Sequence, residues 1–151
     1  MHLVHFDIAQ IQRYVFGSNK LDDHIGGSMQ VQDLLDRHLE AAGAPLFGDH
    51  WSEGFDPRRP ALCVIKSGGN ALVLCREKHD AEQLIGALSQ RQLAEAPGLS
   101  LLAAQVALPP NFAVGGDESG FARARKEAER ELRRQKNRQA ALSFAELPPV
   151  L

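Results

Sequence analysis

The chain has 151 residues, of which 44% are hydrophobic and 24% charged, and its formal net charge is −2. These values are typical of one globular domain, or of one domain with a tail. Two cysteines do not make a disulfide scaffold, and no apolar run reaches the roughly 18 residues of a membrane-spanning helix. No basic-then-apolar leader opens the sequence, so we expect a cytoplasmic protein with no membrane partner.

The first predicted element is a strand at residues 2–8 (HLVHFDI), which places Asp7 near its C-terminal end. A helix is expected to begin with Ser28 as its N-cap, because apolar residues follow at helical spacing. Gly43 comes just after the last of these residues and is expected to end the helix. Between the strand and this helix, Ile11, Tyr14 and Val15 predict a short helical turn.

The segment from residue 43 to residue 60 is irregular, with three prolines and three glycines. It is long for a loop without secondary structure inside a compact domain. We therefore expect a short strand at Leu46-Phe47, and we expect Trp51 to anchor the segment to the core.

The clearest element is a β-hairpin at residues 61–76. Two apolar, β-rich runs, ALCVIK and ALVLCR, are joined by SGGN, which is typical hairpin-turn chemistry. Cys63 and Cys75 flank this turn symmetrically and could face each other across it. Two reduced thiols are the favoured interpretation, and a pairing between them stays open.

A helix is predicted to start at Asp80 as its N-cap, with Gln83 completing a capping box, and to end at Pro97. The run LSLLAAQVAL, residues 99–108, is apolar on both faces and predicts a central strand. A last helix is predicted over residues 119–139.

The last helix is strongly basic. Between Arg123 and Arg138 there are eight lysines and arginines against three glutamates, a local charge of +5, so the remainder of the chain carries −7. Such a helix suits an anionic ligand or an acidic neighbouring domain. We divide the chain into a palm-like domain at 1–115, the basic helix at 116–142 packed on or beside it, and a tail or linker at 143–151.

The order strand, helix, hairpin, helix, strand predicts an α+β, ferredoxin-like fold, an antiparallel sheet with helices packed on one face. RNA-binding modules, nucleotide cyclases and polymerase palms share this arrangement, so the fold alone does not define a function. In palm-type nucleotidyl transfer, carboxylates hold two divalent cations at the end of the first strand and in the hairpin turn. Asp7 is placed to be the first carboxylate, but the turn reads Gly-Asn-Ala and supplies none. We do not expect this chain to be an efficient nucleotidyltransferase by itself.

The stretches FDIAQIQRYVFGSNKLDDHIGGS and VIKSGGNALVL resemble the palm of the large signalling-polymerase subunit of type III CRISPR effector complexes. That family has a strand ending in Asp-Ile, an Ile-Gln pair, an aromatic or Ile followed by Phe, and a small residue before a helix-starting Ser. The corresponding pairs here are Asp7-Ile8, Ile11-Gln12, Val15-Phe16 and Gly27-Ser28. The family's active palm has Gly-Gly-Asp-Asp in the turn, where this chain has Gly68-Gly69-Asn70-Ala71. The similarity covers about residues 3–108.

Subunits of this family carry two palms that face each other around two ATP molecules, and only one palm has the acidic turn. The resemblance therefore implies a degenerate palm in antiviral signalling that binds ATP or another nucleoside triphosphate, with Mg²⁺ at Asp7. Its implied partners are a second palm in the same chain, in another chain or in a homodimer, and an RNA-containing effector complex. Catalysis is expected only with that second palm. The implied nucleotide-binding residues are Asp7, Gln12, Lys20, Ser28, Gly68, Gly69 and Asn70, and Lys136 could reach a triphosphate.

Plainer interpretations stay open for each of these residues. Asp7 could be a hydrogen-bonded acid at a strand end, the glycines could serve only the turn, and Ser28 could act only as a cap. The chain could also be an interaction module whose basic helix docks a protein or RNA. A further alternative is an N-terminal fragment of a larger nucleotidyltransferase, which the LPPVL ending suggests.

Overall fold

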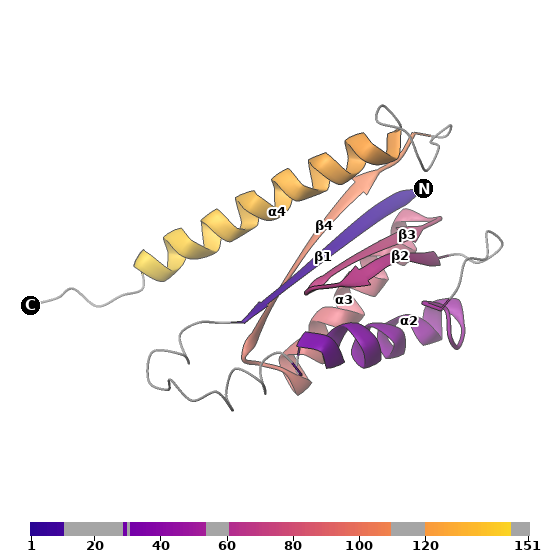
Figure 1. Ribbon diagram of the computed structural model, residues 1–151, viewed down its shortest axis with the longest axis horizontal. Helices are drawn as coiled ribbons and strands as arrows, with labels where there is room; N and C mark the ends of the chain where they lie inside the picture. The colour runs from indigo at the N-terminus through magenta and orange to yellow at the C-terminus, as the bar shows by residue number, and fades with distance from the viewer. Residues whose placement is uncertain (11–28, 30, 54–60, 110–119, 146–151) are drawn as a thin grey trace, which may run out of the picture.

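The computed structural model describes residues 1–10, 29, 31–53, 61–109 and 120–145 (Figure 1). Their alternating and helical apolar patterns produce a four-stranded sheet and four helical segments. In chain order these are β1 (His2–Gln10), the π-helical η2 (Leu34–His38), α2 (Leu39–Phe47), β2 (Ala61–Ser67), β3 (Asn70–Cys75), α3 (Lys78–Glu95), β4 (Leu99–Ala107) and α4 (Gly120–Ala145). No helix within these ranges is both long and apolar enough to cross a membrane.

The sheet has the strand order β2-β3-β1-β4, and every neighbouring pair is antiparallel. This arrangement confirms the predicted α+β, ferredoxin-like palm fold, but the prediction that helices pack on one face only is wrong, because α4 covers the second face. The prediction that residues 99–108 form a central strand is wrong, because β4 lies at the edge and β1 is central. β4 is apolar on both faces because helices cover both faces of the sheet, as Figure 1 shows.

Alternate residues of β1 face opposite helical layers, as the period of a strand requires. Val4, Phe6 and Ile8 pack in a core with η2, α2 and α3, whereas Leu3 packs in a second core with α4. The first core is the helix-covered face expected of a ferredoxin-like sheet. The second core is formed by the apolar stripe of α4, which lies along β1 and β4. Asp7 shares the parity of Leu3 and therefore lies on the α4 side.

Gly43 does not end its helix, contrary to the prediction. α2 continues through Pro45 to Phe47 and ends at Gly48. Gly48 has a φ of 95°, a backbone conformation that glycine adopts more readily than other residues. The predicted strand at Leu46-Phe47 is therefore also wrong. Gly43 has a packing role instead, since a Cβ atom there would lie 2.3 Å from Trp51 Cε2. Trp51 is fully buried, which confirms the predicted anchor, and its Nε1 donates a hydrogen bond to the Glu40 carbonyl oxygen at 2.9 Å.

α3 begins at Lys78 with Glu77 as its N-cap, so the predicted cap at Asp80 is wrong. Asp80 lies in the first helical turn, where a carboxylate still interacts favourably with the helix dipole. α4 extends to Ala145, six residues beyond its predicted end at 139.

Cys63 and Cys75 are free thiols. In the hairpin register Cys75 lies opposite Ala61, and Cys63 lies opposite Val73, so the two cysteines do not face each other. Burial raises the pKa of the Cys75 thiol to about 12. The thiol therefore stays protonated in the folded protein at neutral pH.

Candidate functional site

The β1–β3 register brings Asp7 to the hairpin turn. Asp7 lies directly opposite Asn70, and Asn70 follows Gly68-Gly69 in the chain. The structure therefore groups four of the predicted site residues at one end of the sheet. The other three predicted residues, Gln12, Lys20 and Ser28, lie outside the described residues.

The two turn glycines have different structural roles. Gly69 is buried at φ +83°, and a Cβ atom there would lie 2.8 Å from the Ile8 carbonyl oxygen. The Ile8 amide donates a hydrogen bond to the Gly69 carbonyl oxygen at 2.7 Å, which fastens the turn to β1. Gly68 also has a positive φ, +61°, but faces open space. Of the two, Gly68 exposes its backbone at the surface, whereas the backbone of Gly69 packs against β1.

Asp7 is paired with a cation from α4. Its side chain is 15% exposed, and its Oδ2 lies 2.5 Å from Lys136 Nζ, while the Lys136 side chain is half-exposed. An ammonium group thus already balances the carboxylate that the sequence predicts as a metal ligand. Within the described ranges, no three His, Cys, Asp or Glu side chains come together as metal ligands. The Asp7 carboxylate, already paired with Lys136, and the Asn70 amide do not provide the set of oxygen ligands that Mg²⁺ requires.

His5 is a site residue that sequence reasoning missed. It is 7% exposed, and its Nε2 lies 2.9 Å from Asn70 Oδ1. Its Nδ1 has no hydrogen-bond partner among the described residues. The alternation of side chains along a strand could have identified His5, because it lies two residues before Asp7 and therefore on the same face of the sheet. His5 thus contacts Asn70, and Lys136 contacts Asp7, on the face of the sheet that α4 covers.

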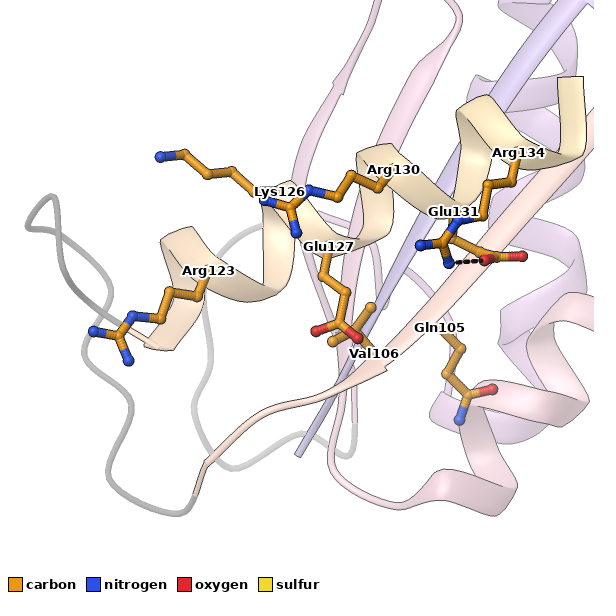
Figure 2. A pocket seen from close by; sticks show the side chains of 8 residues that line it. All are labelled: Gln105, Val106, Arg123, Lys126, Glu127, Arg130, Glu131 and Arg134. Carbon is orange, nitrogen blue, oxygen red and sulfur yellow. Dashed lines mark hydrogen bonds and ion pairs between the residues drawn. The ribbon is translucent and has the colours of Figure 1, made fainter. Parts of the chain in front are cut away.

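A second feature lies on the outer flank of α4, between this helix and β4 (Figure 2). It is a groove of about 570 Å³, lined on the β4 side by Gln105 and Val106. The α4 residues that line it are Arg123, Lys126, Glu127, Arg130, Glu131 and Arg134. Four of the eight cations counted between Arg123 and Arg138 therefore line this groove, together with two of the three glutamates.

Solved structures share this fold. The apo Csm1–Csm4 cassette matches at a TM-score of 0.61 and 16% identity, over 89% of this chain and 18% of that chain. The Csm1–Csm4 cassette in complex with cA3 matches at 0.62 and 15%, over 91% and 19%. Csm1 in T. onnurineus matches at 0.60 and 18%, over 99% and 20%.

This chain is thus similar in fold to part of Csm1, the large type III CRISPR subunit, and the resemblance seen in the sequence is confirmed at that level. The chain spans about a fifth of the length of the Csm1 chains that it matches. No family model and no curated protein matches the sequence.

Proposed function

We propose that this chain is a catalytically degenerate palm of the type III CRISPR kind. In this proposal it binds a nucleoside triphosphate at the hairpin turn, with ATP as the first candidate, and pairs with a catalytic palm. One observation carries the proposal: Asp7 and the Gly-Gly turn are adjacent, yet the turn offers Asn70 and Asp7 is held by Lys136. In this proposal, the chain keeps the strand acid and the glycines of a palm site and lacks the two acids of the turn.

Lys136 supplies the positive charge that a metal ion would otherwise bring. An ammonium group has three donors, and the half-exposed side chain can share them between Asp7 and a phosphate oxygen. The backbone of Gly68 in the hairpin turn is exposed, and among the described residues no atom lies within 4 Å of the position that its Cβ atom would take. Nucleotide binding by this arrangement needs no Mg²⁺. No described residue is placed to hold a metal-activated nucleophile, so the proposal includes no reaction.

The matched structures support an adenine nucleotide as the ligand class. Csm1–Csm4 cassettes were solved in complex with pppApApA and with cA3. By analogy, the acidic groups that this chain lacks would come from a second palm, either in another subunit or in a second copy of this chain. That partner would belong to a multi-subunit effector complex, as the cassette structures suggest.

Isothermal titration of ATP into the purified chain, with Mg²⁺ and with EDTA, tests this proposal. We expect binding that survives EDTA and that Lys136→Met weakens about tenfold or more, as loss of a charged hydrogen bond does. Lys126→Met is the matched control, because it removes an exposed lysine from the same helix. No heat with any nucleoside triphosphate, from monomer or dimer, would overturn the proposal. Binding that requires Mg²⁺ and Asp7 would favour the alternative of a nucleotidyltransferase domain.

A further inference from the structure

We propose that the groove between α4 and β4 docks an extended, acidic segment of a protein partner, which adds to the edge of β4 as a further strand. This inference does not depend on nucleotide binding, because the groove lies on the flank of α4 away from the Lys136–Asp7 pair. Three observations support it: an unpaired strand edge, a row of unpaired cations beside it, and the spacing of those cations.

The edge of β4 is open to pairing beyond Ala103, whose outward-facing carbonyl oxygen is already taken by a side chain of α4. β4 pairs with β1 along all nine of its residues, and no other strand in the described part of the chain pairs with it. An edge strand presents backbone donors and acceptors that can pair with another chain. α4 covers one face beside this edge and contacts it through Gln135, whose Nε2 donates to the Ala103 carbonyl oxygen at 2.9 Å. The groove opens further along the strand, at Gln105 and Val106.

The cations beside the edge lack partners. Arg123, Lys126 and Arg130 form no ion pair with any other described residue, whereas Arg134 pairs with Glu131 at 3.3 Å. Figure 2 shows the three unpaired side chains extending from α4 in one general direction, and Glu127 reaching toward Val106. A partner with negative charge would satisfy this row.

The spacing of the cations fits a strand. Residues four apart on an α-helix are separated by about 6 Å along its axis, which is the step from Lys126 to Arg130. Alternate side chains of a strand are separated by about 6.6–6.8 Å. A strand beside β4 with an acid at every second position can therefore meet Lys126 and Arg130, whereas the step from Arg123 to Lys126, about 4.5 Å along the axis, is too short for this match. Addition of a strand to a sheet edge is an established mode of peptide recognition.

The lining favours a peptide over a nucleic acid. None of the lining residues is aromatic, whereas single-stranded nucleic acid is typically held by stacking on aromatic rings. Glu127 and Glu131 alternate with the cations, so a continuous row of phosphates would meet both carboxylates. A peptide can place neutral residues opposite these carboxylates.

Fluorescence anisotropy with the full chain tests the inference. The probe is a labelled peptide of about five residues that alternates valine and glutamate, short enough to pair with β4 beyond the Gln135–Ala103 contact. We expect it to bind, and we expect Arg130→Glu to weaken binding about tenfold or more. Arg133→Glu is the matched control, since it makes the same charge change at an exposed residue of α4 that does not line the groove. It should change the affinity less than about threefold.

Two further peptides separate strand addition from simple charge attraction. The same peptide N-methylated at alternate residues cannot donate along one edge and should lose binding, and a valine–lysine peptide should not bind. Circular dichroism of both variants checks that they fold. Absence of binding at millimolar peptide, or equal effects of Arg130→Glu and Arg133→Glu, would overturn the inference. Binding of a uridine oligonucleotide that only Arg130→Glu weakens, without peptide binding, would assign the groove to nucleic acid instead.

Discussion

Lys136 Nζ lies 2.5 Å from Asp7 Oδ2, so helix α4 neutralises the acid of β1 that lies opposite Asn70. The two residues belong to the first strand and the last helix of the described chain. Their contact joins the ferredoxin-like core to α4 at the point where a palm would hold its first metal ion.

Loss of Lys136 should lower stability. Lys136→Met leaves the largely buried Asp7 carboxylate without its cation, and we expect a loss of about 1–2 kcal/mol in the free energy of unfolding, less than for a fully buried pair. Urea denaturation measures the change. The exposed Lys126→Met should stay within about 0.5 kcal/mol of the unchanged protein. The double variant Asp7→Asn with Lys136→Met should recover part of the loss, and a purely additive result would argue against the pair.

The two turn glycines should differ in their tolerance of alanine. Gly69→Ala forces a Cβ atom against the Ile8 carbonyl oxygen at positive φ, and we expect it to cost about 2–4 kcal/mol. Gly68→Ala adds a Cβ atom in open space, so it is disfavoured only by the positive φ and should lower the free energy of unfolding by about 1–2 kcal/mol. Thermal and denaturant unfolding of both variants gives the comparison. Equal losses would contradict the close approach of the turn to β1.

Gly43→Ala should disturb the core around Trp51. The added Cβ atom would overlap the indole ring, and a cost of about 1–3 kcal/mol is expected. Trp51 fluorescence should shift to longer wavelength as the ring is displaced toward solvent. Gly86→Ala in α3 is the control, because no atom lies within 4 Å of its Cβ position. That change should stabilise the protein by about 0.5–1 kcal/mol, and destabilisation of similar size at both positions would contradict the packing role of Gly43.

Stability should fall at alkaline pH because of Cys75. Burial raises its pKa from 9.0 to about 12, so between these values the folded state retains a proton that the unfolded state has lost. The stabilisation is complete below pH 9 and is lost as the pH rises toward 12, with a slope of up to about 1.4 kcal/mol per pH unit. Urea denaturation at several pH values measures this slope. Cys75→Ala should flatten it, and an unchanged slope in that variant would assign the effect to other groups.

Several elements could be predicted because their signals are local. The alternating residues of β1, the glycines between two β-rich runs, and the basic stripe of the last helix each lie within one short segment. The positions at which helices begin and end were predicted less accurately. Gly43 is a typical stop signal by residue type, but in the fold it makes room for Trp51, a residue eight positions later. Likewise Asp80 had the pattern of a cap, yet α3 begins two residues before it.

The sequence alone determined the strand that carries Asp7, the Gly-Gly hairpin, the order of elements and the absence of acids from the turn, because these follow from residue type and short-range period. Only the tertiary structure decided that Lys136 neutralises Asp7, that His5 joins Asn70, and that β4 is an edge strand with a cationic groove beside it. The His5–Asn70 contact and the edge position of β4 depend on how the strands pair, whereas the Lys136–Asp7 contact and the groove depend on how α4 packs. Its apolar stripe is buried against Leu3, Leu102 and Val106, and that burial, rather than any local pattern, sets which side of the helix meets each edge of the sheet.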